Sequence, residues 1–402
     1  MKRSPSLPQA FPQNIKFGSG PTAKINKEER FFDESVMGRS HRSVLGLQHI
    51  QKILASLRSV LQIPPSYEIA LTNGSGTGAM EMLLWNLLGP KPVDVFSAGI
   101  FGQHWLHDVQ EELKLPTHSF SAPVGQNPDF SRYHPDHDGV CVWVETPSGT
   151  AIPHADWVPS ERAGLVVCDA TAALFSGTFP WEKMDAVAFS WQKGLGGEAG
   201  IGTIVLSPRA LARLNAYTPP WPNPRLFRIP FTQNAAGQKE VEDLFWQGRT
   251  INTISLLTIQ DMQSALDWAE KKGSLPGLLQ RVQGNYEAIK EWVQKTPWAD
   301  FLVEEEENRA KNVLCLRLKD PQTQQSAAWP LLKKIAQLLE QKNVAVDILN
   351  HAFSTPALRI WAGPVIETKD LRALMGEIEW TYAECCKEDS LQLQEPRRKP
   401  VA

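Results

Sequence analysis

The chain lacks any uninterrupted apolar run long enough to cross a bilayer, and no apolar core follows the basic residues near its N-terminus. We therefore expect neither a membrane-spanning segment nor a signal peptide. Basic residues are not in excess either, because 41 lysines and arginines stand against 44 aspartates and glutamates, for a net charge of −3. This balance predicts no nucleic-acid-binding face and no membrane-surface patch.

Cysteine is also scarce. The five cysteines form neither a CxxC motif nor a spacing typical of metal ligands, and they are Cys141, Cys168, Cys315, Cys385 and Cys386. We therefore predict no metal site. The first three lie inside apolar runs, where a small buried thiol is the ordinary occupant. This usage is typical of a reducing compartment, and we expect a cytoplasmic protein.

The 402 residues, 42% hydrophobic and 21% charged, indicate a globular protein of two domains. Apolar residues recur at helical spacing from Val44 to Leu61, and a second helix is expected from about Ala79 to Leu88. Short apolar runs predict buried strands at 67–72, 93–96, 140–144, 165–168, 186–189 and 202–206. Continuous apolar strands that alternate with helices predict an α/β domain with a mostly parallel sheet, covered on both faces.

The C-terminal part has a different pattern. A proline- and arginine-rich stretch at 217–230 predicts an irregular surface connection, and a long helical region is expected from about Ile254 through Lys295. Beyond it, strands are predicted near 313–318 and 358–361, and helices near 329–341 and 369–385. These elements predict a smaller α+β domain.

The segment 186–200, AVAFSWQKGLGGEAG, places Lys193 at the end of a buried strand and before a glycine-rich stretch. The glycines leave room for a bulky group beside the backbone. A lysine held there can lose hydration, become a nucleophile and form a Schiff base with a carbonyl compound. An ordinary exposed turn fits the same residues when they are taken alone.

Three further positions follow predicted strands. The loop Asn73–Gly78 (NGSGTG) precedes a helix, where backbone N–H groups and the helix dipole favour an anion such as phosphate. It also fits a tight turn that needs glycine for geometry only. Asp169 closes the strand at 165–168, where α/β proteins place ligand groups, although it could simply cap the next turn. Thr146 lies on the same expected rim.

A glycine loop, a carboxylate and a lysine at strand ends are what pyridoxal phosphate requires. The glycines hold its phosphate, the carboxylate keeps its pyridine nitrogen protonated, and the lysine binds its aldehyde. Four motifs then agree with one family, namely Phe17–Pro21 (FGSGP), Ser40–Arg42 (SHR), Trp191–Gly197 (WQKGLGG) and Asn252–Thr253. These motifs occur in the family's order between about residues 16 and 260. By them the chain resembles class V, fold-type-I pyridoxal-phosphate aminotransferases, and within that class the phosphoserine aminotransferase family.

The resemblance implies a role for each matching residue. Lys193 would bind the cofactor aldehyde, Asp169 would pair with the ring nitrogen, Phe101 would stack on the ring and Thr146 would contact its hydroxyl. The phosphate would be held by Gly76, Thr77, Gln192, Asn252 and Thr253. The substrate would be bound by His41, Arg42, His351 and Arg359, with Arg359 at its carboxylate, and His41 and Arg42 at its phosphate.

The chain departs from the family pattern at three places. Thr77 stands where an arginine is common, and Phe101 where a tryptophan is common, although a hydroxyl and a phenyl ring can still serve. In the C-terminal part, His351 is followed by Ala352 where an arginine is common. One cationic contact to the substrate is therefore missing or moved, and Arg225 or Arg228 could replace it.

The resemblance also implies the organisation of the whole protein. A seven-stranded large-domain sheet would occupy a pyridoxal-phosphate-binding domain of residues 17–260, with an N-terminal arm at 1–16, a small domain at 261–386 and a flexible tail at 387–402. Two chains would form a homodimer with the active site at the interface. The substrates would be glutamate and 3-phosphohydroxypyruvate, with O-phosphoserine as product, in serine biosynthesis, and the resemblance also allows a role in pyridoxine biosynthesis.

Three alternatives remain at this point. Serine–pyruvate and alanine–glyoxylate aminotransferases share the fold, cofactor and lysine but need no phosphate site, so the Ser40–Arg42 match counts against them. Cysteine desulfurases need a cysteine on a mobile loop, whereas Cys315 lies in an alternating strand. A non-catalytic protein that binds a phosphorylated ligand would need neither Lys193 nor Asp169.

Overall fold

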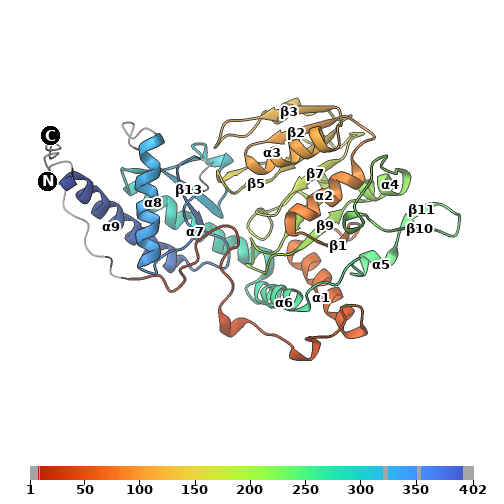
Figure 1. The fold of residues 1–402 in the computed structure, drawn as a ribbon, viewed down its shortest axis with the longest axis horizontal. Coiled ribbons are helices and arrows are strands. Elements are labelled where there is room, and N and C mark those ends of the chain that lie inside the picture. The colour runs from red at the N-terminus through yellow and green to blue at the C-terminus, as the bar shows by residue number, and fades with distance from the viewer. Residues whose placement is uncertain (1–7, 9, 320–324, 351–354, 393–402) are drawn as a thin grey trace, which may run out of the picture.

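One sheet of seven strands organises the larger part of the chain, in the order β1-β9-β8-β7-β4-β2-β3 (Figure 1). Its strands are β1 Glu68–Asn73, β2 Val93–Ser97, β3 Thr117–Ser121, β4 Asp138–Val142, β7 Val166–Asp169, β8 Ala186–Ser190 and β9 Ile201–Leu206. The computed structural model describes residues 8, 10–319, 325–350 and 355–392. In this sheet β9 pairs antiparallel with β1 and β8, and the other pairings are parallel. The predicted mostly parallel seven-stranded sheet of an α/β fold is confirmed.

Helices cover both faces of this sheet because alternate strand residues point to opposite sides. Ile69 and Leu71 of β1 join the core that contains the apolar face of α1, whereas Ala70 joins the core of α2 and α4. The helices of this part are α1 Val44–Leu61, α2 Ser75–Leu87, α3 Ile100–His107, α4 Pro208–Ala216, α5 Asp243–Trp246 and α6 Leu256–Lys271. The observed bounds of α1 agree with its predicted bounds, and the Ser43 side chain accepts a hydrogen bond from the Gly46 N–H at its start.

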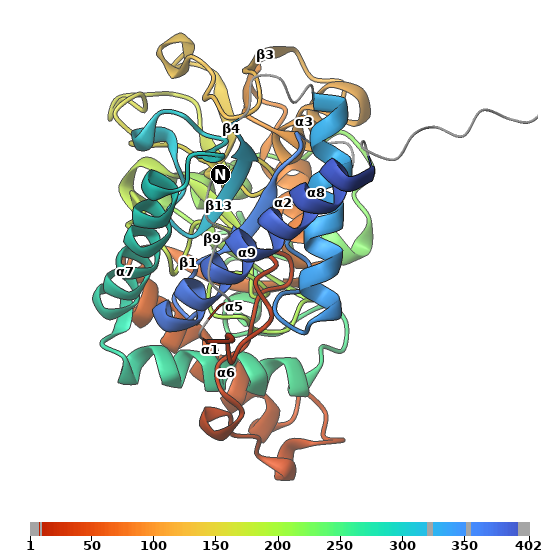
Figure 2. The same cartoon turned by 90° about the vertical axis from the view of Figure 1, so that its left-hand side faces the viewer.

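A smaller three-stranded antiparallel sheet lies beside the first and comes from the C-terminal part. Its elements are β12 Ala299–Phe301, β13 Val313–Leu318, β14 Leu358–Trp361, α7 Ser274–Lys295, α8 Gln325–Gln341 and α9 Thr368–Gln392. Figure 2 shows α8 and α9 packed together on the side turned toward the viewer. The predicted smaller α+β part of the fold is therefore present.

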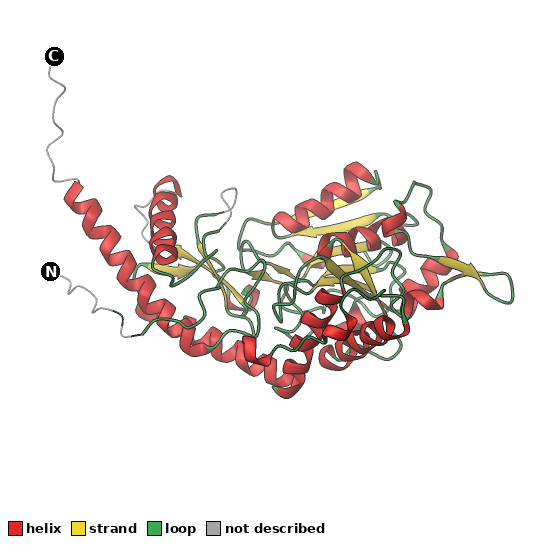
Figure 3. Ribbon diagram, turned by 60° about the horizontal axis from the view of Figure 1, so that its bottom comes forward, coloured by secondary structure: helices red, strands yellow, loops and turns green. Residues whose placement is uncertain are grey.

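Two short hairpins complete the described elements. One, β5 Val144–Glu145 with β6 Thr150–Ala151, lies beside the large sheet, and the other, β10 Phe231–Gln233 with β11 Lys239–Val241, stands away from the body of the molecule (Figure 3). The 217–230 stretch is irregular apart from a single 3₁₀ turn at Arg225–Phe227, as predicted. No helix in the described part of the chain has the length and apolarity needed to cross a membrane.

Several boundaries differ from the sequence predictions. The helix expected from Ala79 begins at Ser75, so most of the glycine loop is its first turn. The strand expected at 140–144 leaves the sheet after Val142 and re-forms as β5. The single helical region at 254–295 is two helices, because Gly273 takes a left-handed φ of 96° between α6 and α7. The tail expected from residue 387 begins inside α9.

The chain before α1 runs along the small sheet before it reaches the large one. The Gln13 N–H donates to the Asp370 carboxylate of α9 at 2.9 Å, and the Trp361 N–H of β14 donates to the Phe17 carbonyl at 2.7 Å. The next residues then cross to the turn after β8. The N-terminal segment therefore connects the C-terminal elements with the carboxyl edge of the large sheet.

Candidate active site

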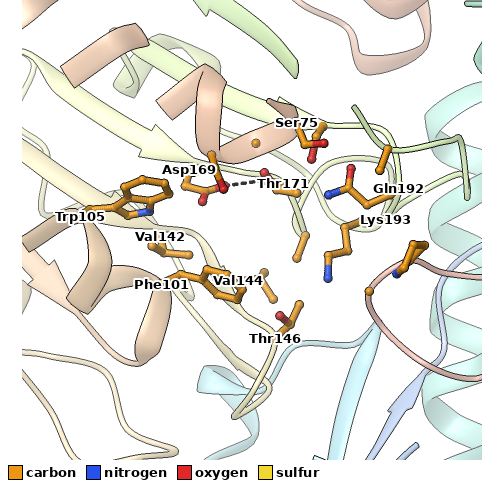
Figure 4. Close-up of a pocket in the computed structure, with 17 residues that line it drawn as sticks. Ser75, Phe101, Trp105, Val142, Val144, Thr146, Asp169, Thr171, Gln192 and Lys193 are labelled. Atoms are coloured by element: carbon orange, nitrogen blue, oxygen red, sulfur yellow. Dashed lines mark hydrogen bonds between the residues drawn. The ribbon is translucent and has the colours of Figure 1, made fainter. Parts of the chain in front are cut away.

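A pocket of about 310 Å³ opens at the edge of the large sheet where its parallel strands end (Figure 4). Ligands of open α/β sheets bind at this edge. Seven of the residues predicted to contact the cofactor line it, namely Gly76, Thr77, Phe101, Thr146, Asp169, Gln192 and Lys193. The remaining residues that line it are Gly20, Pro21, Ser75, Trp105, Val142, Val144, Thr171, Ala172, Ser190 and Ala199.

One end of the pocket is the N-terminus of α2. Because α2 begins at Ser75, the N–H groups of Gly76 and Thr77 belong to its first turn and have no intrahelical partner. A β-carbon at Gly76 would lie 2.6 Å from Thr171 Oγ1, so glycine is required for this close approach. Two polar side chains, Ser75 of α2 itself and Gln192 from the turn after β8, also face this end. The arrangement offers N–H donors and a positive dipole end to an anion.

Asp169 lies at the carboxyl end of β7 and is buried. Burial raises the pKa of its carboxyl, and a hydrogen bond of 3.0 Å from the Thr171 N–H acts in the opposite direction. A buried carboxylate of this kind gains most from a cationic N–H partner, which would compensate for its lost hydration. A protonated pyridine nitrogen is such a partner.

Lys193 follows β8, the strand next to β7 in the sheet. Burial, with the charge of Arg359 as a second cause, lowers the pKa of its amine to about 8, although the Asp169 carboxylate opposes both effects. The amine donates to the Ser19 carbonyl. Thr22 holds the turn from the other side, since its hydroxyl donates to the Lys193 carbonyl at 2.6 Å. Lys193 is therefore a buried amine that loses its proton more easily than an ordinary lysine.

Phe101 is placed by a carboxylate from a different strand. The buried Glu145 of β5 accepts hydrogen bonds from the Gly102 N–H at 2.7 Å and from the Phe101 N–H at 3.4 Å. Burial raises the pKa of Glu145 to about 7, and these two hydrogen bonds act against that increase. The first turn of α3, which carries the Phe101 ring, is therefore tied to the hairpin that carries Thr146.

The polar atoms around the pocket fit a bound polar cofactor. Buried polar atoms normally have hydrogen-bond partners. Among the described residues, two buried polar atoms of the pocket lining have none in the chain: Ser190 Oγ and Gln192 Oε1. A ligand with a phosphate at the α2 end and polar ring atoms toward Asp169 would supply partners. The residues present therefore fit pyridoxal phosphate.

The predicted substrate residues divide into two groups. Arg359 of β14 is buried, close enough to Lys193 to lower the pKa of its amine, and its Nε is a buried atom without a partner among the described residues. His351, and Ala352 beside it, lie outside the described residues.

The second group of predicted substrate residues, His41 and Arg42, is absent from the pocket lining. Two residues predicted to hold the cofactor phosphate, Asn252 and Thr253, also lie outside it. Arg42 donates to the Thr250 and Ile251 carbonyls at 3.2 and 3.1 Å, and the Asn252 amide donates to Asn73 Oδ1 at 2.8 Å. Arg42 and Arg228 line a second cavity together with Arg249, whereas Arg225 lines neither this cavity nor the Lys193 pocket.

Sequence reasoning missed several residues of the pocket lining. Thr171 and Ser190 lie within two or three residues of Asp169 and Lys193, so the strand-end rule that found those two could have included them. Trp105 follows Phe101 by four residues on α3, which places both on one helix face. Glu145 gave no signal, because a buried acid inside an apolar run carries no motif.

Cys315 does not meet the needs of a desulfurase. It is buried in β13, with its Sγ 3.5 Å from the Pro147 carbonyl, and burial raises the pKa of its thiol to about 12. A reactive cysteine needs a lowered pKa and access. The structure therefore supports the prediction that Cys315 is structural.

Known proteins resemble this chain in sequence and in fold. No protein-family model matches the chain. A phosphoserine aminotransferase of Methanosarcina mazei is 38% identical over 379 residues, which cover 93% of this chain and 98% of the relative.

Two solved structures share the fold. A phosphoserine aminotransferase of Bacillus circulans subsp. alkalophilus has a TM-score of 0.76 at 18% identity, covering 92% of this chain and 99% of that one. A phosphoserine aminotransferase of Trichomonas vaginalis with bound pyridoxal phosphate has a TM-score of 0.72 at 18% identity, covering 91% and 99%.

Proposed function

Because the chain belongs to the phosphoserine aminotransferase family, we propose that it transfers an amino group from glutamate to 3-phosphohydroxypyruvate, giving O-phospho-L-serine and 2-oxoglutarate. Its membership makes it a pyridoxal-phosphate-dependent aminotransferase of fold type I. The proposed reaction belongs to serine biosynthesis in the cytoplasm, and a related phosphorylated keto acid would extend it to pyridoxine biosynthesis. The observation that carries the proposal is the pocket that Lys193 and Asp169 share.

Each end of the pocket would hold one part of the cofactor. The N–H groups of Gly76 and Thr77, with Gln192, would bind its phosphate, and Asp169 would hold the proton of its ring nitrogen. Phe101 would stack on the ring, and Thr146 would contact its hydroxyl. When bound, pyridoxal phosphate supplies an electron sink for the charge that develops at the substrate Cα.

Lys193 has two tasks in this proposal. Its amine would hold the cofactor aldehyde, which the low pKa favours because only the neutral amine is a nucleophile. With an amino substrate in the pocket, the freed Lys193 amine would accept the proton from the substrate Cα. The same amine would then give that proton up within the same half-reaction, so that it acts as general base and then as general acid.

Two cationic regions would bind the two anionic ends of the substrate. Arg359 lies near Lys193 and has a buried Nε without a partner in the described chain, so it can bind the carboxylate. We propose that His41 and Arg42 bind the phosphate in the pocket of a second subunit, together with Asn252 and Thr253 at the cofactor. This arrangement requires a homodimer with the active site at the interface.

The visible spectrum of the cofactor-loaded protein tests this function. Addition of O-phospho-L-serine should convert the cofactor to its aminated form and abolish its visible band. L-Alanine and L-serine should do so with at least about 100-fold lower kcat/KM, because they leave the phosphate-binding cations unpaired.

A Lys193→Ala variant is the control for the chemistry, and its turnover should fall by more than about 1,000-fold. If alanine or serine reacts as well as phosphoserine, the proposed specificity is wrong, and an alanine–glyoxylate or serine–pyruvate type of reaction replaces it.

A further inference from the structure

Three histidines converge on one buried carboxylate at the edge of the large sheet opposite to the Lys193 pocket. This Asp94 cluster consists of Asp94 on β2, His118 on β3, and His134 and His137 in the turn before β4. Asp94 and His118 are register partners of the parallel β2–β3 pair. The residues of β4 separate the cluster from the pocket by about 13 Å along the strand.

The distances within the cluster are short and mutually consistent. Asp94 Oδ1 lies 2.8 Å from His137 Nδ1 and 3.1 Å from His118 Nδ1, and Asp94 Oδ2 lies 2.9 Å from His134 Nδ1. The three imidazole rings are 4.7 to 5.3 Å apart between centroids. One ligand atom from each of the four residues lies within 4.8 Å of the others.

The backbone around the cluster holds the turn in place. The His137 N–H donates to the His134 carbonyl at 2.9 Å, and the Gly164 N–H donates to the Pro135 carbonyl at 2.9 Å. The Tyr133 hydroxyl donates to the His137 carbonyl at 3.1 Å. These hydrogen bonds hold the backbone of the turn that carries His134 and His137, and none of them involves a bound ion.

Satisfying Asp94 does not require three histidines. Its carboxylate also accepts the His134 backbone N–H at 2.8 Å, so one imidazole together with this N–H would already pair both oxygens. The side chains of His118 and His134 are 52% and 53% exposed, so each imidazole could bond to water in place of Asp94. Instead, both rings face the buried Asp94 carboxylate, His118 toward Oδ1 and His134 toward Oδ2, as ligands gathered around one ion do.

We propose that the Asp94 cluster binds a divalent transition-metal ion, and specifically Zn²⁺. Imidazole nitrogens and a carboxylate are ligands that zinc accepts in four-coordinate tetrahedral sites. Neighbouring ligand atoms in such a site lie about 3.3 Å apart when the bonds are about 2.0–2.1 Å. To reach that spacing, the contacts to Asp94, now 2.8 to 3.1 Å, would open by a few tenths of an ångström, and the wider separations between ligand atoms, at most 4.8 Å, would close.

The bound ion would have a structural role. Four protein ligands close a zinc site, whereas catalytic sites keep one position open. The ion would tie the edge strand β3 and the turn before β4 to β2. Because it binds the folded chain, zinc should raise the unfolding temperature in proportion to its affinity and concentration. This role is independent of the aminotransferase reaction.

Zinc titration of the full-length, tag-free, cofactor-loaded protein tests the proposal. After removal of metals with a chelator, the protein should bind one Zn²⁺ per chain in competition with a chromophoric chelator, and its unfolding temperature should rise. Co²⁺ in place of Zn²⁺ should give the intense visible bands of tetrahedral coordination. The readouts do not depend on activity, so their failure is separate from failure of the proposed function.

Matched variants locate the ion. His118→Ala and His134→Ala change half-exposed side chains and should each weaken zinc binding by at least about 100-fold, because even loss of an outer-shell partner costs 10–100-fold. His154→Ala, an exposed histidine elsewhere, should bind zinc like the unaltered protein. If the unaltered protein binds no stoichiometric zinc, or if His154→Ala loses binding as the cluster variants do, the proposal is wrong.

Discussion

Lys193 shows how its surroundings set the chemistry of a single residue. An ordinary lysine amine is protonated at neutral pH and cannot attack a carbonyl. Burial lowers the pKa of Lys193 to about 8, with the nearby charge of Arg359 as the second cause. A substantial fraction of the amine is therefore neutral near physiological pH, which is the form that binds the cofactor aldehyde.

The pH dependence of cofactor binding tests this pKa. The rate at which apoprotein takes up pyridoxal phosphate should rise with pH and level off above about pH 8, because protonated Lys193 is not a nucleophile below that value. The rate is measured by the growth of the visible absorption. Arg359→Gln should move the midpoint upward, since one of the two causes of the lowered pKa is removed. A midpoint near that of free lysine in the unaltered protein would contradict the assignment.

The strand ends explain why part of the site could be predicted. Asp169 and Lys193 follow apolar runs, and the end of a buried parallel strand points into the ligand crevice whatever the details of packing. Glu145 has no such signal, because its role depends on where α3 begins relative to β5. The start of α2 was predicted four residues too far along the chain, because glycines are poor helix formers. The fold explains two of them, since a β-carbon at Gly76 would lie 2.6 Å from Thr171 Oγ1 and one at Gly78 would clash with the Asn73 carbonyl oxygen.

Glu145 leads to a prediction for the element it anchors. Glu145→Ala removes the acceptor of the Gly102 and Phe101 N–H groups, so the start of α3 should loosen and the Phe101 ring should lose its position. We expect a loss of about 1 kcal/mol of stability, similar to loss of a helix cap, and a roughly tenfold weaker cofactor affinity. Thermal unfolding and cofactor dissociation measure the two effects.

Glu145→Gln is the matched control for this prediction, because its amide oxygen can still accept from the Gly102 N–H. It should keep most of the cofactor affinity. It also removes a group whose pKa is raised to about 7, mainly by burial. A carboxyl group whose pKa is raised in the folded protein stabilises the fold below its unfolded pKa, and this contribution is lost as the pH rises through 7. Above pH 7 the glutamine variant should therefore gain stability relative to the unaltered protein. Equal losses in both variants would exclude the hydrogen-bonding role.

At the scale of the whole molecule, large apolar side chains are exposed in the chain segments next to Arg42 and Asn252. They are Phe31, Phe32, Met37, Val44, Ile251 and Leu257. Apolar side chains that gather on a surface mark an interaction site. These segments carry the predicted phosphate-binding residues that the Lys193 pocket lacks, which fits the proposed homodimer.

Long-range assembly also limits what the sequence could predict. The motif residues Arg42 and Asn252 were identified by resemblance, but no pattern within one chain shows which pocket they serve. The Asp94 cluster was missed for a related reason. Its members run from Asp94 to His137 and come from two strands and the turn before a third, so only the folded sheet brings them together. Local periodicity predicts elements, whereas the pairing of β2 with β3 and β4 depends on the whole fold.

Mixing two inactive variants tests whether Arg42 serves the pocket of its own chain or that of a partner. Arg42→Ala and Lys193→Ala should each be nearly inactive on phosphoserine. When they are mixed and allowed to exchange subunits, half of the dimers are mixed, and each mixed dimer has one site with both Arg42 and Lys193. Activity should therefore return to about a quarter of that of the unaltered enzyme, because a two-fold interface exchanges equivalent residues between subunits. If Arg42 served the pocket of its own chain, each site in the mixed dimer would lack one of the two residues, and no activity would return.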